Sequence, residues 1–570
     1  IEFKASSNSS LIPVFVEENI FILFWLQNSL TRLSLLTQTI STLSSLNDST
    51  IFSNIAFESS ILFEVDKILS NLDIGLIKSL TGIAIKKFFV IKVLYIFHPI
   101  KLYIEMARKT KIIATIGPSV NSKELVGQII DAGANVLRLN FSHGTHEDHK
   151  KVVEWARSSN KKIAIMQDIQ GPKIRTGELE QPIYLERNKE IQLSNEIKSK
   201  DKETVLINYE NLFNDIHEGE RVLIDDGKIV LRISKKTKTK FTSIIEVGGE
   251  LRSNQGVAFP DSSLSLATLT DKDKNDIEFG NQLDVDFVAV SFVRDADDIL
   301  NVKKLINPNT MVIAKIELKS AVKNLKSIIE ESDGVMVARG DLGVQLPLER
   351  IPFIQKEILN ESNLQGKITI TATEMLTSMI SSYRPTRAEV SDITNAILDG
   401  TDSVMLSAET SIGDNPILSV QAMANICEEV DETSNKNYLN KKDISVSNEL
   451  TNSLSKAAVQ VANDSNAKAI VAFTETGRTP LLLSNHRPDA PIFTFTTIDK
   501  TYNQLNLFWG VEQVKINRLE TTDEMFSIAN KWLKDEMNFK KNDTVVIVAG
   551  TPPNKEAATN LIRVMKIGEF

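Results

Sequence analysis

The feature that most constrains the fold is a pattern that recurs between residues 111 and 409. Short runs rich in Val, Ile and Ala return along the chain, most of them followed by a polar turn and a helical pattern. The eight runs are KIIATIG, ANVLRLNF, KIAIMQD, DFVAVSF, MVIAKIE, GVMVAR, KITITA and SVMLSAE. Because their hydrophobicity is continuous, we expect strands buried on both faces, and their alternation with helices predicts a parallel sheet. Eight such units predict an α/β fold with a closed (β/α)8 TIM barrel.

The pattern is interrupted after the third run. From residue 173 to about 258 alternating strands replace the helices, as in IYLERNKEIQL, RVLIDDGKIVLRI and FTSIIEV, which predicts a small all-β domain inserted at a barrel loop. A polar stretch after about residue 432 marks a further boundary, and AIVAFTETG, APIFTFTT and TVVIVAGT then indicate a smaller α/β domain. The predicted division is a barrel over 106–172 and 259–435, an inserted β-barrel over 173–258, and a C-terminal α/β domain over 436–570.

Residues 1–105 differ from the rest, since Ser, Asn, Leu, Ile and Phe dominate and charges are sparse. The longest uncharged runs, 19–31 and 33–47, are shorter than the roughly 18 to 20 residues that span a bilayer, so we expect no membrane anchor. Three interpretations stay open: a targeting leader, a helical accessory segment, or a chain that properly begins at Met106. A leader favours a plastid-type organelle, whereas a start at Met106 favours the cytoplasm.

Composition excludes several classes of protein. The chain has 570 residues, with 65 Lys and Arg against 74 Asp and Glu, a net charge of −9 and a single cysteine, Cys427. The acidic balance argues against a nucleic-acid binder that neutralises phosphates broadly. One cysteine forms no internal disulfide and no cysteine-based zinc cluster, so the fold does not depend on an oxidising compartment.

Chemically capable side chains gather at the predicted carboxyl ends of the strands, where barrels of this type carry function. They are Arg138, Asn140, Ser142 and His143 after the second run, Asp168 with Lys173 and Arg175 after the third, Lys315 and Glu317 at the fifth, Arg339, Gly340 and Asp341 at the sixth, Thr371 and Thr373 at the seventh, and Glu409 at the eighth. Each alone suits an ion pair across the barrel mouth. Jointly they favour an active site.

The acids and bases of this set suggest one chemistry. Glu317 and Asp341, expected on adjacent strands, are hard oxygen ligands suited to Mg²⁺, which keeps open positions for a substrate. Arg138, Arg175 and Lys315 are cations suited to clamping an anion. Two acids that hold a metal among three cations favour phosphoryl transfer, in which the enzyme positions groups and neutralises developing charge.

Longer segments of the chain resemble the pyruvate kinase family. They are KIIATIGPSV, DAGANVLRLNFSHGTHEDH, QDIQGPKIRTGEL, IDDGK, IAKIE, DGVMVARGDLGV, ATEMLTSM, RPTRAEVSDITNAILDGTDSVMLSAETSIGDNP and TETGRTP, in the family's order. The resemblance implies transfer of the phosphoryl group of phosphoenolpyruvate to ADP, giving pyruvate and ATP in the last step of glycolysis. It also implies a B domain that closes over the nucleotide and a homotetramer built on barrel and C-terminal domain contacts.

The resemblance implies roles for single residues. Lys315 corresponds to the catalytic lysine that neutralises the transferring phosphoryl group and the enolate oxygen, and Arg138 corresponds to a contact of the phosphoryl group. Glu317 and Asp341 correspond to the Mg²⁺ ligands. Thr373 corresponds to a threonine near the protonated face of the enolate, where a proton relay needs ordered water or another acid.

Three further groups of positions match binding residues of the family. The segment that receives the substrate carboxylate, at a helix N-terminus, matches Ala338, Arg339, Gly340 and Thr373. The nucleotide side matches Arg175, Asn140 and His143. The monovalent cation of potassium-dependent members is held at positions that match Asn140, Ser142, Asp168 and the carbonyl of Ile169.

One departure from the family bears on that monovalent cation. Potassium-dependent members commonly read DTKGPEIRTG, whereas this chain reads DIQGPKIRTG with Lys173 in place of the glutamate. Members that need no potassium tend to carry lysine there, and its ammonium group would supply the charge that K⁺ otherwise provides. We therefore expect an enzyme that depends on Mg²⁺ and not on K⁺. The alternative is a hinge lysine that points into solvent.

In the C-terminal domain TETGRTP resembles a loop that binds an effector sugar phosphate. The hydroxyls, turn and cation of this phosphate cradle are Thr474, Thr476, Gly477, Arg478 and Thr479. The later segment AGTPPNKEAATN lacks glycines that are often seen in the partner loop. Fructose 1,6-bisphosphate, a sugar monophosphate and a turn without any ligand all stay open.

Two other functions fit the sequence less well. A catalytically silent, phosphometabolite-binding member would lack at least one of the catalytic or metal-binding side chains, and all of them are present. A barrel aldolase or lyase that acts on phosphoenolpyruvate or pyruvate needs no ADP, so the inserted domain and Arg175 argue against it.

Overall fold

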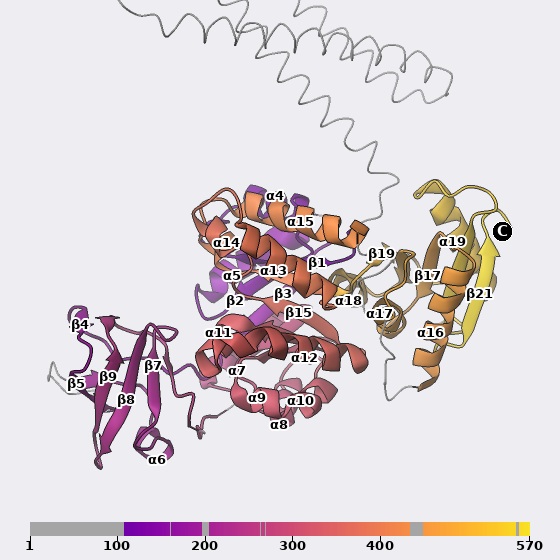
Figure 1. The fold of residues 1–570 in the computed structure, drawn as a ribbon. Helices are drawn as coiled ribbons and strands as arrows, with labels where there is room; N and C mark the ends of the chain where they lie inside the picture. The colour runs from indigo at the N-terminus through magenta and orange to yellow at the C-terminus, as the bar shows by residue number, and fades with distance from the viewer. Residues whose placement is uncertain are drawn as a thin grey trace, which may run out of the picture. The chain divides into compact units, whose positions relative to one another are not determined.

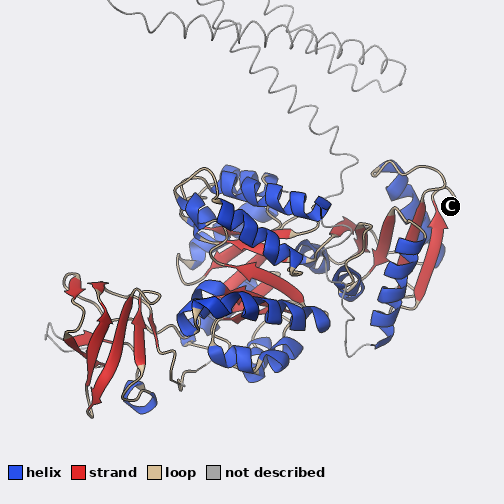
Figure 2. Ribbon diagram, in the orientation of Figure 1, coloured by secondary structure: helices blue, strands red, loops and turns tan. Residues whose placement is uncertain are grey.

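The computed structural model describes residues 108–570 except 160, 196–203, 263, 268, 434–448 and 554–557. The predicted extension, 1–105, lies outside the described residues. The chain forms a closed barrel of parallel strands (Figures 1 and 2), with β1 paired to both β2 and β16. Its strands are β1 (Lys111–Ile116), β2 (Val136–Asn140), β3 (Ala164–Ile169), β12 (Phe287–Val290), β13 (Met311–Ile316), β14 (Gly334–Ala338), β15 (Ile368–Ala372) and β16 (Ser403–Leu406). The predicted TIM barrel is confirmed, with one strand from each apolar run.

Helices surround the barrel strands (Figure 1). They are α4 (Lys123–Asp131), α5 (His146–Arg157), α7 (Asp271–Gln282), α8 (Ala296–Lys303), α9 (Lys319–Lys323), α10 (Leu325–Glu331), α11 (Arg339–Gln345), α12 (Ile351–Leu364), α13 (Arg387–Leu398), α14 (Ala408–Ser411) and α15 (Pro416–Thr433), with 3-10 turns at Leu348–Arg350 and Thr377–Ile380. Three of these helices begin with a capping box, at Thr145, Thr270 and Thr386. In each, the threonine side chain accepts the backbone N–H of an acidic residue three positions later, and the side chain of that acid accepts the backbone N–H of the threonine. Among the described residues, no helix combines the length and apolarity that crossing a membrane requires.

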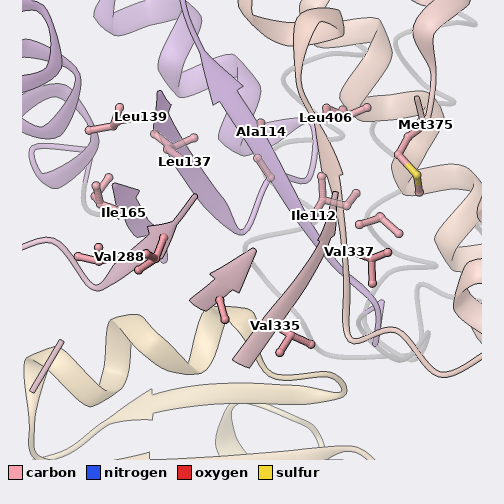
Figure 3. Close-up of a cluster of buried hydrophobic side chains, with 14 of the residues drawn as sticks. Ile112, Ala114, Leu137, Leu139, Ile165, Val288, Val335, Val337, Met375 and Leu406 are labelled. Carbon is pink, nitrogen blue, oxygen red and sulfur yellow. The ribbon is translucent and has the colours of Figure 1, made fainter. Parts of the chain in front are cut away.

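Side chains alternate along each barrel strand between the helices and the barrel interior. The side chains packed against the helices form one buried cluster, part of which Figure 3 shows; it includes Ile112, Ala114, Leu137, Leu139, Ile165 and Val288. Their neighbours along the strands belong to a separate cluster, which includes Ile113, Val136, Met166, Ala289 and Ile313. Burial on both sides explains why the sequence shows continuous hydrophobicity in these runs.

Among the described residues between β3 and α7, every regular element except one short helix is a strand (Figure 2). The elements are β4 (Ile183–Leu185), β5 (Glu190–Ser194), β6 (Thr204–Leu206), α6 (Leu212–Asp215), β7 (Arg221–Ile224), β8 (Ile229–Lys236), β9 (Phe241–Val247), β10 (Gly249–Leu251) and β11 (Val257–Ala258). Six strands form a sheet in the order β11-β7-β8-β9-β5-β6, and β4 pairs with β10. Arg175 bridges Gly256 beside β11 and Thr176 bridges Ile207 beside β6, so this segment joins the two edges of the sheet.

IYLERNKEIQL divides into β4 and β5, which belong to different sheets. The division falls at a turn in which Asn188 has a φ of 65°, a left-handed conformation that ends a strand. All strands of this segment fall within the predicted range 173–258, and the domain boundaries themselves stay predictions.

The C-terminal residues form a second α/β unit. Its elements are α16 (Glu449–Asp464), β17 (Ala469–Phe473), α17 (Arg478–Asn485), β18 (Ile492–Thr496), α18 (Asp499–Gln504), a 3-10 turn (Leu505–Leu507), β19 (Val511–Lys515), α19 (Thr522–Asp535), β20 (Thr544–Ala549) and β21 (Leu561–Lys566). The sheet order is β19-β18-β17-β20-β21, and only the β20–β21 pair of this sheet is antiparallel. The sequence patterns predicted β17, β18 and β20 but not β19 or β21. These two lie at the sheet edges, where burial on one side leaves a weaker hydrophobic signal.

Candidate active site

Polar side chains take the inward positions at the carboxyl ends of four barrel strands. The alternation that turns Val136, Met166, Ala289 and Ile313 inward also turns inward the residues two positions later, which are Arg138, Asp168, Ser291 and Lys315. Glu317 continues the same alternation just after β13. Parallel strands of a closed barrel end at the same rim, so residues distant in sequence meet there.

Four of the predicted residues form a continuous chain of ion pairs. Arg138 Nε lies 2.7 Å from Asp168 Oδ2, and Lys315 Nζ lies 3.2 Å from Asp168 Oδ1 and 2.8 Å from Glu317 Oε1. We call Arg138, Asp168, Lys315 and Glu317 the ion-pair chain. At most 11% of any of these side chains is exposed, so its charges interact with little screening by water.

Burial and charge oppose each other within the ion-pair chain. Burial alone would raise the pKa of Asp168, but Arg138 and Lys315 outweigh it and hold this pKa below its usual value. Burial likewise disfavours the charge of Lys315, and the carboxylates of Asp168 and Glu317 outweigh it and raise its pKa above the usual range. Burial raises the pKa of Glu317 to about 7, with Lys315 lowering it and the charge of Asp341 raising it. Lys315 is thus a fixed cation, and Glu317 lacks a full counter-charge.

Ser291 and Thr115 complete this group, and the strand-end analysis of the sequence missed both. Lys315 Nζ donates to Ser291 Oγ at 2.8 Å, and Ser291 Oγ donates to the carbonyl of Ile169 at 2.7 Å. Arg138 Nη1 donates to Thr115 Oγ1 at 2.9 Å. The same rule of strand ends, applied to the first and fourth runs, would have pointed to Thr115 and Ser291.

A backbone amide also binds Glu317. Phe292, which follows Ser291, has a φ of 57°, and its N–H donates to Glu317 Oε2 at 2.7 Å. A left-handed phenylalanine is strained, and here the strain coincides with an amide directed at a candidate metal ligand. The remaining oxygen, Oε1, is the one that contacts Lys315.

The segment after β14 forms a second part of the site. The sequence placed Asp341 at a strand end, but β14 ends at Ala338 and Asp341 lies in the first turn of α11, near enough for its charge to act on Glu317. The Gly340 N–H donates to Thr373 Oγ1 at 2.9 Å. The structure therefore joins Gly340 at the start of α11 to Thr373 at the end of β15.

The predicted nucleotide and monovalent-cation residues lie partly together. Asn140 Oδ1 accepts a hydrogen bond from the Ser142 N–H at 3.1 Å. Burial lowers the pKa of His143, and the charges of Arg175, Lys173 and Arg138 lower it further. Arg175 itself donates to the carbonyl of Asn254 at 3.0 Å, so this contact of its side chain lies in the segment between β3 and α7 and not in the ion-pair chain. Glu409 accepts the N–H groups of Leu376 and Ser407, which gives it a structural role.

Two family models match the chain. One is described as pyruvate kinase, barrel domain, and covers residues 107–420; the other is described as pyruvate kinase, alpha/beta domain, and covers 452–565. The chain belongs to the pyruvate kinase family. The resemblance read from the sequence motifs is confirmed, and with it the enzyme class, a phosphotransferase with pyruvate kinase activity.

Curated relatives agree with this membership. Pyruvate kinase 2 of Synechocystis sp. is 42% identical to the chain over 477 residues, which cover 80% of this chain and 79% of the relative. The pyruvate kinase of Staphylococcus saprophyticus is 40% identical over 474 residues and that of Staphylococcus aureus is 39% identical over 474, each covering 81% of both chains. As a pyruvate kinase family member, the chain acts on phosphoenolpyruvate and ADP.

The α/β domain of this pyruvate kinase family member contains a cavity of about 530 Å³. Thr474, Thr476, Arg478 and Thr479 line it, as does an apolar wall that includes Phe473. The fifth predicted effector residue, Gly477, precedes α17 with a φ of 80° and donates its N–H to Thr474 Oγ1 at 3.0 Å, which is a conformation that favours glycine. Burial lowers the pKa of Arg478.

Proposed function

We propose that phosphoryl transfer from phosphoenolpyruvate to ADP takes place at the ion-pair chain. The observation that supports this is the position of Lys315, whose ammonium group lies between two carboxylates and a serine hydroxyl at the barrel rim. Held in this way, the cation neutralises charge on the transferring phosphoryl group and on the enolate oxygen without having to reorganise. Arg138, fixed by Asp168 and Thr115, binds the phosphoryl oxygens from β2, which β3 and β12 separate from the β13 strand of Lys315.

The donor set at Glu317 and Asp341 fits Mg²⁺. Both are hard oxygen ligands. Burial is the main cause of the raised pKa of Glu317, and the nearby charge of Asp341 raises it further; a divalent cation at this position would favour the charged form of both carboxylates. When bound, Mg²⁺ would supply charge stabilisation for the phosphoryl group and substrate carboxylate. Phe292 N–H holds Glu317 from one side, so the carboxylate is oriented before any ligand arrives.

Substrate binding and protonation involve α11 and Thr373. We assign the substrate carboxylate to the amides of Ala338, Arg339 and Gly340 at the start of α11, a helix N-terminus. The Gly340 N–H donates to Thr373 Oγ1, so it would have to exchange this acceptor for the carboxylate. Thr373 Oγ1 accepts the Gly340 N–H and donates to the carbonyl of Ala372. We assign this hydroxyl to the face on which the enolate is protonated, where it would pass the proton on with ordered water or an acid.

A coupled assay for pyruvate tests the proposed reaction directly. Pyruvate is expected to form from phosphoenolpyruvate only when ADP and Mg²⁺ are present, and chelation of the metal should stop it. Pyruvate that appears without ADP would indicate a lyase or phosphatase. No pyruvate under any condition would indicate a silent family member.

Independence from K⁺ is a second expected result. We assign nucleotide binding to Arg175, Asn140 and His143. Lys173 is half-buried, and its positive charge acts on His143, so it lies close to this nucleotide side of the site. In buffer without Na⁺ or K⁺ we expect activity within about twofold of that with saturating K⁺, because a lysine ammonium is a compact fixed charge. The variant Lys173→Glu should become dependent on K⁺.

If K⁺ raises the activity of the unaltered enzyme more than about tenfold, the hypothesis that the Lys173 ammonium group takes the place of K⁺ is wrong. In that case Asn140, Ser142, Asp168 and the Ile169 carbonyl would be the expected K⁺ ligands.

Activation through the C-terminal cavity is a third expected result. We assign a sugar phosphate to the loop of Thr474, Thr476, Gly477, Arg478 and Thr479, because hydroxyls, a turn and a cation there suit a phosphate. Fructose 1,6-bisphosphate and a sugar monophosphate should be titrated separately at subsaturating phosphoenolpyruvate, beside Arg478→Gln. Activation that disappears in the variant supports the site, and a flat response to both compounds leaves the loop structural.

We further assign a homotetramer and, for residues 1–105, an organellar leader. Exposed apolar side chains on the barrel helices and loops, among them Leu348, Phe353 and Tyr383, support an interface between copies of the chain. Light scattering should give the mass of four chains. Mass spectrometry of the endogenous protein should identify an N-terminus that lies downstream of a removed leader. A chain that starts at Met106 would instead favour the cytoplasm.

A further inference from the structure

The side chain of Arg339 holds a backbone turn. Its Nε and Nη2 donate to the carbonyl of Thr373 at 3.2 and 2.7 Å, and Nη2 also donates to the carbonyl of Glu374 at 3.0 Å. The family resemblance assigns only the backbone amide of Arg339 to the substrate. Its guanidinium therefore has a separate task, which is to bind the loop that follows β15.

That loop has an uncommon conformation. Thr373 has a φ of 65° and Glu374 a φ of 54°, a left-handed region in which a β-branched residue such as threonine is an outlier. Two successive residues of this kind persist only where the surrounding structure holds them. The planar fork of Arg339 suits this task because its donors approach both carbonyls in a fixed geometry.

The turn is also tied to the start of α11. Thr373 Oγ1 accepts the Gly340 N–H at 2.9 Å and donates to the Ala372 carbonyl at 2.6 Å. The hydroxyl proposed for proton relay and the Gly340 amide proposed for the substrate carboxylate are thus joined by a hydrogen bond. The Arg339 side chain binds the same turn through the carbonyls of Thr373 and Glu374.

One carboxylate fixes Arg339 on its remaining side. Asp392, in α13, accepts a hydrogen bond at 2.5 Å from Nη1, the guanidinium nitrogen that neither carbonyl uses. The Arg339 side chain is 8% exposed and that of Asp392 is 42% exposed. Removing the carboxylate would leave a buried guanidinium without its counter-charge, which favours a shift of that group toward water.

We propose that Asp392 is a positioning residue for the reaction: through Arg339 it holds the left-handed Thr373–Glu374 turn, and so sets where the Thr373 hydroxyl and the Gly340 amide meet the substrate. The inference rests on the roles proposed above for Thr373 and the α11 amides. Asp392 itself touches no substrate in this scheme.

The test compares Asp392→Asn with Asp399→Asn. Both aspartates belong to the same helix region, and Asp399 pairs with Lys356 at the other end of α13, so the control removes one carboxylate of an ion pair away from the Thr373 turn. We expect Asp392→Asn to lower kcat about tenfold with the KM for ADP changed less than about twofold, because the charge-assisted contact to Arg339 is weakened while the nucleotide side is untouched. Asp392→Glu should recover part of kcat. The control should match the unaltered enzyme in kcat.

A double-mutant cycle with Thr373→Val identifies the route. If Asp392 acts through Thr373, Asp392→Asn should cost little further kcat in the Thr373→Val background. An equal loss in both backgrounds, or kcat values for Asp392→Asn that equal those of Asp399→Asn, would overturn the positioning role and leave the proposed function intact. Unaltered kcat in Thr373→Val alone would instead contradict the proposed role of Thr373, and the inference with it.

Discussion

Replacement of Lys315 by methionine is expected to lower kcat by about 10³-fold, because it removes the fixed cation that would neutralise the transferring phosphoryl group and the enolate oxygen. The loss should appear in kcat, since a charge that develops during transfer is stabilised more than the bound substrate is. Stopped-flow or coupled assays at saturating phosphoenolpyruvate and ADP measure it. Lys315→Arg keeps a cation beside Asp168 and Glu317 but not a point charge at Nζ, and it should remain strongly impaired while preserving the fold.

A second buried lysine provides the control for this variant. Lys111, in the same barrel, donates to the carbonyl of Val511 at 2.8 Å and lies 3.5 Å from Glu512. Lys111→Met makes the same chemical change away from the ion-pair chain, and it should lower thermal stability without lowering kcat of the folded enzyme. A kcat for Lys315→Met within about tenfold of the unaltered enzyme would contradict a charge-stabilising role.

Glu317→Gln is expected to weaken Mg²⁺ binding by about 100-fold or more, since even the outer partners of a metal site contribute about 10- to 100-fold to affinity. The amide keeps the shape of the side chain and its acceptor for the Phe292 N–H, but it removes the negative charge. Titration calorimetry with Mg²⁺, or competition against Mn²⁺ followed by spectroscopy, measures the affinity independently of turnover.

Glu409 offers a matched control for the metal prediction. It is also a buried glutamate beyond a barrel strand, with 3% of the residue exposed, and it accepts two backbone N–H groups. Glu409→Gln should lower stability and leave Mg²⁺ affinity unchanged. If both variants lose Mg²⁺ affinity equally, the loss in Glu317→Gln is not evidence that Glu317 binds the metal.

Much of the fold could be predicted from the sequence because burial leaves a periodic signature. Each of the eight apolar runs became a barrel strand, since a strand covered by helices on one side and by the barrel interior on the other must be apolar at nearly every position. The edge strands β19 and β21 lack that constraint, and the patterns missed them. Asp341 shifted from the predicted strand end into α11, because the limits of neighbouring elements depend on hydrogen bonds that a hydrophobic pattern does not report.

The sequence by itself determined the barrel, the family and the residue types that phosphoryl transfer needs. Tertiary structure alone decided which of those residues touch. Asp168 joins Arg138 to Lys315 because β2, β3, β12 and β13 close side by side at one rim, and Ser291 enters the group for the same reason. Asp392 reaches Arg339 across 53 positions of sequence. The physical reason is that motif and periodicity report local backbone and burial, whereas ion pairs and hydrogen bonds depend on distances that only the closed barrel sets.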